Sequence, residues 1–219
     1  MNAPAERDRE LERRLQAALG AGFALEGPIG QGGFALVFAA RDVGLNRAVA
    51  VKVLRPELAG VAAVRERFRR EADAVARLRH PHVIPVYAVG EGDGLAWYVM
   101  PVVTGASLRA RLDRERRLSI AEARRILGEA AAALAAAHRA GVLHRDIKPD
   151  NILLDGDEAR VLLTDFGIAK AIGGDTPAGA LTATGVVVGT PHYMSPEQAS
   201  GERGIDHRSD LYSLGVVAY

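Results

Sequence analysis

Two short segments of the sequence gather side chains suited to phosphate and metal chemistry. The segment HRDIKPDN at 144–151 packs an Asp, a Lys and an Asn into six residues, a poor composition for a regular element and a good one for a rigid loop. The segment TDFG at 164–167 places Asp165 fourteen residues beyond Asn151. Asn and Asp side chains supply the hard oxygen ligands that Mg²⁺ prefers while it stays bound to phosphates. The pair therefore predicts a site for Mg²⁺ and a phosphate-bearing ligand.

A glycine-rich segment near the N-terminus is suited to contact phosphates through its backbone. It reads GQGGFALV at 30–37 and lies between two runs with strand character, 23–29 and 35–41. Glycines let the backbone approach phosphates closely, and consecutive N–H groups cradle them. The turn of an ordinary hairpin is the alternative, because such turns are also rich in glycine. A dinucleotide-binding fingerprint is disfavoured, since it requires a helix after the glycines and here a strand follows.

One lysine stands inside an apolar run. Lys52 belongs to the segment 49–54, and a buried Lys is costly without a partner, so its side chain either points outward or meets an acidic group. The candidate partner is Glu71, on the helical segment that follows. The alternative is that Glu71 pairs on the surface of its own helix with Arg67 or Arg70.

The elements that must position these residues change character along the chain. The first part has strand-like runs with short connections, which favour an antiparallel sheet, at 23–29, 35–41, 47–54, 83–90 and 95–102. A helical segment at 61–78 interrupts them. A long Ala-rich helix follows at 119–140, opened by a capping box of Ser119 and Glu122. Strands followed by helices predict an α+β protein in two lobes.

This organisation predicts three regions. Residues 1–22 form a short amphipathic helix that docks on or caps its neighbours, because the leucines at 11, 15 and 19 recur every four residues among Arg and Glu. Residues 23–103 form the first lobe, and residues 104–219 form the second. The joint between the lobes is expected at 103–105.

Composition excludes several kinds of protein. A content of 48% hydrophobic and 25% charged residues is that of a globular protein, and a net charge of +1 gives no argument for nucleic acid or a membrane surface as the partner. Without cysteine the chain has no disulfide, thiolate metal site or Cys nucleophile. It shows neither a signal-peptide pattern nor a run of about 18 apolar residues. We therefore expect a cytoplasmic chain with no membrane segment of its own.

Taken together, five motifs resemble one family. The glycine-rich loop, the strand Val-Ala-Val-Lys ending at Lys52, the HRD loop, Asp-Phe-Gly and Ser-Pro-Glu at 195–197 occur in the order found in protein kinases. From Phe23 onward the sequence resembles the bacterial, eukaryote-like (Hanks-type) Ser/Thr kinases. The resemblance implies a two-lobed fold with an antiparallel-sheet N-lobe and a mainly helical C-lobe. It also implies that the chain stops before the last helices of that lobe, and that a membrane anchor would lie beyond residue 219.

The resemblance assigns roles to the chemical residues. Lys52, paired with Glu71, would hold the α- and β-phosphates of ATP, and Asp146 would accept or orient the substrate hydroxyl. Asn151 and Asp165 would bind Mg²⁺, with Mn²⁺ as an alternative metal. The loop over the phosphates would include Gly30, Gln31, Gly32 and Gly33.

The expected adenine contacts come from several elements. They are Val37 and Ala50 above the ring, Leu153 below it, backbone groups of Pro101 and Val103, and Met100 as gatekeeper. Pro101 departs from the usual acidic residue, which is tolerable because the family uses the carbonyl at that position. Ala35 replaces the third glycine of the loop, and we expect it to alter nucleotide affinity without abolishing binding.

The resemblance also implies regulation by the segment between Asp-Phe-Gly and Ser-Pro-Glu. Lys148 follows the Ser/Thr-kinase pattern, and Thr190 would steady the catalytic Asp and Lys. Arg145 would clamp a phosphorylated loop, with Thr182 and Thr184 as the autophosphorylated residues. A solvated loop without a regulatory role is the alternative for this Gly-, Ala- and Thr-rich segment.

Two residues of the expected C-lobe complete the comparison. Asp210 would anchor the catalytic loop, and Glu197 would lack the arginine that pairs with it in the family.

The expected partners are ATP and proteins bearing Ser or Thr, with a homodimer as one arrangement for autophosphorylation in trans. A non-catalytic nucleotide-binding scaffold and a small-molecule kinase of related fold are the alternatives. The first is disfavoured by the complete set of chemical residues and the second by the segments GTP at 189–191 and SPE at 195–197.

Overall fold

The computed structural model describes residues 4–33, 35–166, 191–202 and 204–219. The chain divides into two compact units. The first unit comprises Met1–Ala76 and Val86–Val102, and the second comprises Arg77–Pro85 and Val103–Tyr219. The short segment Arg77–Pro85 therefore belongs with the C-terminal part of the chain, although it lies between elements of the first unit.

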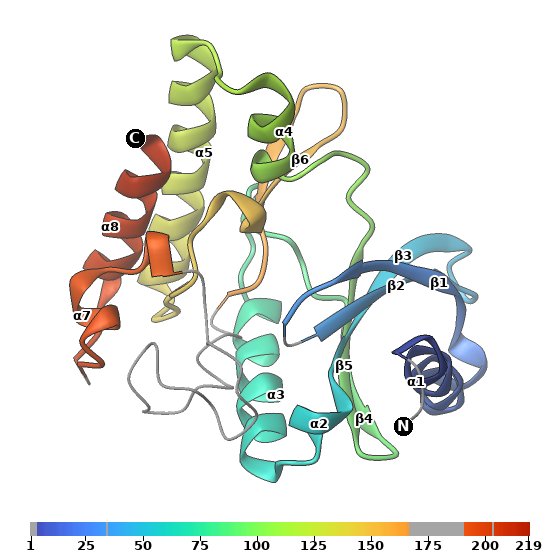
Figure 1. The fold of residues 1–219 in the computed structure, drawn as a ribbon. Helices are drawn as coiled ribbons and strands as arrows, with labels where there is room; N and C mark the ends of the chain where they lie inside the picture. The colour runs from blue at the N-terminus through green and yellow to red at the C-terminus, as the bar shows by residue number, and fades with distance from the viewer. Residues whose placement is uncertain (1–3, 34, 167–190, 203) are drawn as a thin grey trace. The chain divides into compact units, whose positions relative to one another are not determined.

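The first unit is built on a five-stranded antiparallel sheet with the strand order β1-β2-β3-β5-β4 (Figure 1). The strands are β1 (Phe23–Gln31), β2 (Ala35–Asp42), β3 (Arg47–Leu54), β4 (Ala88–Gly92) and β5 (Leu95–Pro101). Lys52 on β3 lies opposite Val37 on β2 and opposite Tyr98 on β5. Because directly opposed residues share a face of the sheet, these three side chains lie on one side.

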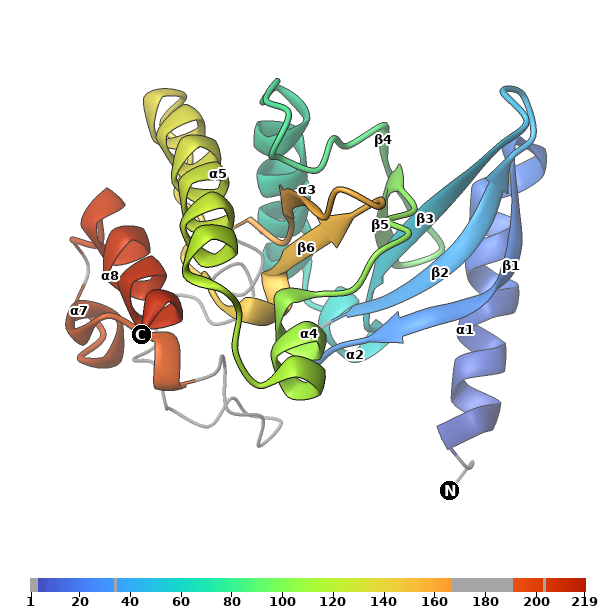
Figure 2. The ribbon, with the colours of Figure 1, turned by 90° about the horizontal axis from the view of Figure 1, so that it is seen from above.

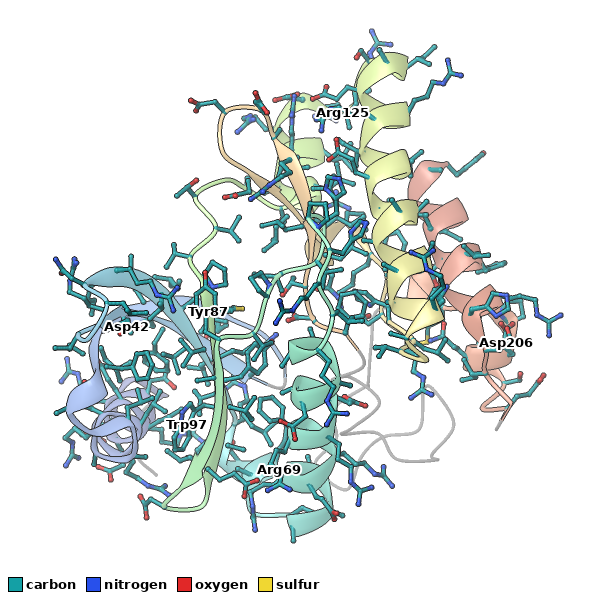
Figure 3. All side chains as sticks on the ribbon, turned by 180° about the vertical axis from the view of Figure 1, so that it is seen from behind. Asp42, Arg69, Tyr87, Trp97, Arg125 and Asp206 are labelled. Carbon is teal, nitrogen blue, oxygen red and sulfur yellow. The ribbon has the colours of Figure 1, made fainter. Side chains whose placement is uncertain are left out.

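The other face of this sheet is closed by helix α1 (Pro4–Leu19), which packs along β1 in both views (Figures 1 and 2). Leu11 and Leu15, one helical turn apart, are almost completely buried. The apolar cluster that they complete contains Leu36, Phe38, Ala40, Val49, Val51, Val53, Leu95, Trp97 and Val99 (Figure 3). Helix α1 is thus part of the core of the first unit.

Polar contacts fix α1 in place. Arg14 donates to the side chain of Asp93, in the turn between β4 and β5, with a distance of 2.7 Å. Gln16 bridges to β1, because its Oε1 accepts from the Leu25 N–H at 2.8 Å and its Nε2 donates to the Phe23 carbonyl at 2.9 Å. The helix ends at Leu19, and Gly20 follows it with a φ of +63°, which glycine adopts without strain.

The face of the sheet that carries Lys52 packs against helix α3 (Ala62–Ala76), which a single-turn helix α2 (Pro56–Ala59) precedes. The Phe68 ring on α3 lies 5.6 Å from the Tyr98 ring, centroid to centroid. The helix predicted at 61–78 is confirmed over most of its length.

The strand predicted at 83–90 is wrong over its first half. Only β4 pairs in the sheet, whereas Val83 forms a parallel bridge to Leu163 in the second unit. Ile84 donates its N–H to the Leu163 carbonyl at 3.0 Å, and both Val83 and Ile84 are buried. The run therefore divides between the two units, since Val83 and Ile84 are buried in the second and Ala88–Gly92 pairs in the sheet of the first, and sequence periodicity does not reveal the division.

The described residues of the second unit form helices and a hairpin. Its helices are α4 (Leu108–Glu115), α5 (Ile120–Arg139), α7 (Pro196–Ala199) and α8 (His207–Ala218), and its strands are β6 (Ile152–Asp155) and β7 (Arg160–Leu163). Single 3₁₀ turns lie at η1 (Gly20–Gly22) in the first unit and at η2 (Pro149–Asn151) and η3 (Pro191–Tyr193) in the second. Helices α5 and α8 lie side by side (Figures 1 and 2).

Helix α5 begins at the predicted cap residue, but only half of the predicted capping box forms. Ser119 caps it by accepting from the Glu122 N–H, while the Glu122 carboxylate pairs with Arg111 at 2.7 Å. Its buried residues are small or aliphatic, and they face β7 and α8: Ile126, Ala130, Ala133, Leu134 and Ala137. At its N-terminal half Arg125 donates to the Ala159 carbonyl in the β6–β7 turn (Figure 3).

Within the described part of the chain, every helix is too short or too polar to cross a membrane.

Candidate active site

The β6–β7 hairpin brings the two expected metal ligands to the same end of the two strands. Ile152 at the start of β6 pairs with Leu163 at the end of β7, and the Thr164 N–H donates to the Asn151 carbonyl at 3.1 Å. Asn151 precedes the first strand and Asp165 follows the second. The φ of +66° at Asp165 is a conformation that non-glycine residues rarely adopt, so the surrounding contacts must stabilise it.

The carboxylate of Asp146 is the centre of the loop. Its Oδ2 accepts from Lys148 Nζ at 2.8 Å and from Asn151 Nδ2 at 2.9 Å. Asn151 Nδ2 also donates to the Asp146 carbonyl at 2.8 Å. Both of these acceptors need an N–H, so the side-chain Nδ2 of Asn151 donates to Asp146. The side-chain Oδ1 of Asn151 is then the atom that can bind a metal. Sequence reasoning grouped these three residues, and the structure brings them into direct contact.

His144 supports the loop from the interior and is uncharged. Its side chain is completely buried, and burial lowers its pKa below the ordinary value. Nε2 lies 2.9 Å from the Thr164 carbonyl and Nδ1 lies 3.4 Å from the Asp146 N–H. A carbonyl only accepts and an amide N–H only donates, so the geometry requires the neutral tautomer with its proton on Nε2. The ring also packs against Phe166, with the centroids 4.4 Å apart.

Asp210 on α8 anchors the start of the loop, as predicted. Its carboxylate accepts from the backbone N–H of His144 at 2.8 Å and of Arg145 at 2.6 Å. The His138 Nε2 lies 2.7 Å from the same carboxylate, a contact that sequence reasoning missed because the two residues stand 72 positions apart. These bonds stabilise Arg145 at a φ of +64°.

Gln198 is a second residue that sequence reasoning missed. Its Nε2 donates to the Arg145 carbonyl at 2.8 Å, while its Oε1 accepts from the Ser195 N–H in a capping box at the start of α7. The signal was present as a Ser followed three residues later by a Gln. Glu197 was expected to lack the arginine that pairs with it in the family. In the structure the Ser209 hydroxyl donates a hydrogen bond to Glu197, and this bond lowers the pKa of Glu197.

In the first unit, the glycine-rich segment is the turn of the β1–β2 hairpin. Gly30 pairs with Val37, and Gln31 pairs with Leu36. The Gly32 N–H donates to the Ala35 carbonyl at 2.9 Å, and Arg55 donates to the Gly32 carbonyl at 3.1 Å. The turn, which includes Gly33, is thus attached to the end of β3.

Strand register places four of the expected site residues on one face. Val37 lies opposite Lys52, Ala39 opposite Ala50, and Ala50 opposite Met100. Their face is the one opposite the α1 cluster, because the buried residues of that cluster alternate with them along each strand. Lys52 is 8% exposed, which shows that this charged side chain is enclosed rather than solvated.

Glu71 lies on the helix that packs against the Lys52 face. It follows Phe68 by three residues, so both side chains are on the same side of α3, and Phe68 contacts Tyr98 next to Lys52 in the sheet. The arrangement therefore favours a role for Glu71 toward the sheet over the alternative of surface pairing with Arg67. Arg70 pairs with Glu66 on the outside of the helix.

The remaining expected residues are distributed between the units and the undescribed segment. Pro101 ends β5, Val103 opens the second unit, and Leu153 lies in β6, where it forms a bridge with Ser107. Thr182, Thr184 and Thr190 lie outside the described residues. The described residues also contain no cluster of three or more His, Asp or Glu side chains that could hold a metal by themselves. A metal at Asn151 and Asp165 would therefore need oxygen ligands from a bound phosphate group or water.

Comparison with known proteins agrees with this arrangement. Residues 23–219 match the sequence model of the family described as protein kinase domain. The chain is 44% identical over 201 residues to the serine/threonine-protein kinase pkn3 of Myxococcus xanthus and 45% identical over 202 residues to PknJ of Mycobacterium tuberculosis. The matches cover 90% and 91% of this chain but 37% and 33% of the two relatives, so it spans about a third of their length.

A solved structure extends the likeness to the fold. The kinase domain of PknI from Mycobacterium tuberculosis matches with a TM-score of 0.72 at 33% identity, over 90% of this chain and 73% of that one. The predicted α+β fold, with an antiparallel-sheet lobe and a mainly helical lobe, is confirmed.

Proposed function

Because this chain belongs to the protein kinase family, whose members use ATP and a divalent metal, we propose that it transfers the γ-phosphoryl group of ATP to Ser and Thr hydroxyls of proteins, its own included. One observation carries this proposal. Asp146 accepts hydrogen bonds from Lys148 and Asn151, and this contact supports a role for the carboxylate in orienting a hydroxyl for in-line transfer.

The reaction assigns a separate task to each oxygen of Asp146. Among the described residues, both side-chain bonds to Asp146 reach Oδ2, and Oδ1 is proposed to accept the proton of the substrate hydroxyl. The hydroxyl oxygen then bonds to the γ-phosphorus, the bond to the bridging oxygen breaks, and ADP leaves. Lys148 compensates negative charge on the transferred group. Thr190 is proposed to steady both residues.

Asn151 and Asp165 are proposed to hold Mg²⁺, with Mn²⁺ as a second metal that suits the same oxygens. The donor set fits, because the two hydrogen bonds of the Asn151 side chain use its Nδ2 and not its Oδ1, and the Asp165 carboxylate is a hard ligand. A bound metal neutralises charge that develops on the phosphoryl group.

Nucleotide binding is proposed for the residues that the resemblance to protein kinases assigns to it. Lys52, supported by Glu71, contacts the α- and β-phosphates, and the turn at 30–33 covers them. The adenine contacts are proposed to be Val37, Ala50, Met100, Pro101, Val103 and Leu153. The shared face of Val37, Ala50, Lys52 and Met100 supports this set.

Phosphorylation of the chain's own loop is the regulatory part of the proposal. Arg145 Nε is buried and, among the described residues, has no hydrogen-bond partner. A phosphate on Thr182 or Thr184 would provide acceptor oxygens for this guanidinium group.

The test is phosphosite mapping and intact mass after incubation with Mg-ATP. Asp146→Asn should reduce phosphate incorporation by at least about a thousandfold, since it removes the proton acceptor. Asp157→Asn, a matched change at an exposed turn of the β6–β7 hairpin, should leave it unchanged. Equal incorporation in Asp146→Asn and the unaltered chain would contradict the proposal.

A second measurement separates a kinase from a nucleotide-binding scaffold. The sequence has only three lysines, Lys52, Lys148 and Lys170, so labelling by an amine-reactive ATP analogue can be assigned directly by peptide mapping. We expect ATP-protected labelling of Lys52 together with phosphate transfer. Labelling without any transfer to protein would support the scaffold.

A further inference from the structure

The segment that follows β5 is attached to strand β6 by backbone bonds. The Leu154 N–H donates to the Ala106 carbonyl at 2.9 Å, and Ser107 forms an antiparallel bridge with Leu153. The segment 103–107 therefore runs beside the strand that carries one of the proposed adenine contacts. Val103, at the start of this segment, is another.

Gly105 makes this close approach possible. A Cβ atom at Gly105 would lie 1.5 Å from the Leu154 carbonyl oxygen and 2.7 Å from the Leu154 carbonyl carbon. Both are backbone atoms of a paired strand, so they cannot turn aside as a flexible side chain does. Because the φ of Gly105 is not in the left-handed region, the requirement for glycine is one of space and not of backbone conformation.

Asp155 supplies a second, polar attachment. Its Oδ1 lies 3.3 Å from the Thr104 N–H and 3.5 Å from the Thr104 hydroxyl. Its Oδ2 pairs with Arg160 at 3.0 Å, across the hairpin. Gly105 is therefore flanked by two attachments to β6. Thr104, before it, is bonded to the Asp155 side chain, and Ala106, after it, is bonded to the Leu154 N–H.

We propose that Gly105 and Asp155 are positioning residues for nucleotide binding, because together they set the place of the Val103 backbone relative to Leu153. The inference rests on the proposed function, which assigns both residues to adenine. It adds two residues that contact no ligand themselves. No motif in the sequence singles them out.

The geometry predicts that the effect falls on binding and not on the transfer step. Strand β6 is paired along its length with β7, whereas Thr104 and Gly105 are exposed. A side chain at position 105 therefore displaces the 103–107 segment outward and leaves β6 in place. Asp146 and Asn151 keep their own bonds, which do not involve that segment.

The test compares Gly105→Ala with Gly128→Ala, a matched change on α5, where a Cβ meets nothing within 4 Å. The dissociation constant of a fluorescent ATP analogue and the KM for ATP should both rise about tenfold in Gly105→Ala, with kcat within about threefold of the unaltered chain. Gly128→Ala should change neither constant. A folded Gly105→Ala protein with unaltered ATP affinity would overturn the inference, and so would a loss confined to kcat.

Asp155→Ala decides the matter if Gly105→Ala fails to fold. It removes the Thr104 bonds without a clash and should raise the dissociation constant about threefold, with Asp157→Ala as the exposed control. An unaltered dissociation constant in Asp155→Ala overturns the inference. If the unaltered chain does not bind the ATP analogue at all, the proposed function is contradicted. If it binds and the variants bind equally well, only the inference on Gly105 and Asp155 is contradicted.

Discussion

The two units hold their proposed functional side chains by different means. In the first unit, Val37, Ala50, Lys52 and Met100 share a face because of strand register alone. In the second, Asp146 and the loop around it are held by side-chain hydrogen bonds from residues distant in sequence, among them Asp210 and Gln198. A face set by register depends on many backbone bonds, whereas a polar network depends on a few individual groups. The second unit should therefore be far more sensitive to single substitutions near its site.

The largest expected effect is that of Asp210→Ala. The carboxylate is 1% exposed and accepts from two backbone N–H groups, which the change would leave without an acceptor in the interior. The free energy of unfolding should fall by about 3–5 kcal/mol, and phosphate transfer by at least about a hundredfold in the protein that remains folded. Denaturant titration and initial rates measure these effects.

The matched control for Asp210 is Asp206→Ala at the start of the same helix (Figure 3). Asp206 caps α8 by accepting from the Arg208 N–H at 2.8 Å. Its loss should lower the free energy of unfolding much less than the loss of Asp210 does, with no change in kcat. Equal effects of the two substitutions would show that Asp210 acts as an ordinary helix residue and not as an anchor of the loop.

Leu15→Ala should separate stability from function in the first unit. Leu15 is fully buried between α1 and the sheet, so its truncation should lower the free energy of unfolding by about 2–4 kcal/mol. The affinity for an ATP analogue should stay within about threefold, because the proposed site lies on the other face of the sheet. Trp97 emission reports the packing of α1, since Trp97 belongs to the same cluster.

Leu45→Ala, at a side chain that is 67% exposed, is the control for Leu15. It should alter stability by less than about 0.5 kcal/mol. A large loss of ATP affinity in Leu15→Ala at a temperature where the protein is folded would show that the two faces are not independent.

The smallest expected effect is a loss of stability on mild acidification. Burial lowers the pKa of His144, so the unfolded chain binds a proton below a pH of about 6.5 that the folded chain does not bind. The free energy of unfolding therefore decreases as the pH falls, by about 1 kcal/mol at pH 5.5. Carboxylates with a lowered pKa, such as Glu129, titrate below this window.

Denaturant titrations at pH 7.5 and 5.5 measure this loss. His144→Gln should reduce the difference between the two values more than His80→Gln does, because burial of His144 is complete and burial of His80 is slight, although the pKa of both is lowered. An undiminished difference in His144→Gln would assign the acid sensitivity to other groups.

Much of the site was accessible to sequence reasoning, because its residues stand in short segments with characteristic spacing. The loop at 144–151 and Asp165 were identified this way, and Asp210 was identified by resemblance to the family. His138, Gln198, Asp155 and Gly105 were not. Each contacts a residue far away in the sequence, such as the Arg145 carbonyl that lies 2.8 Å from Gln198 Nε2, and no local pattern reports such a contact.

The sequence by itself determined the order of most elements, the Ser119 cap of α5, the alternation that separates the faces of the sheet, and the residues proposed to carry the chemistry. These features follow from local periodicity and side-chain type, which are readable along the chain. Only the tertiary structure decided where Val83 and Ile84 are buried, that α1 completes the core of the first unit, and that Gly105 must be free of a side chain. The physical reason is that these features depend on which segments distant in the sequence pack against each other. Such contacts exist only in the folded chain and leave no local pattern in the sequence.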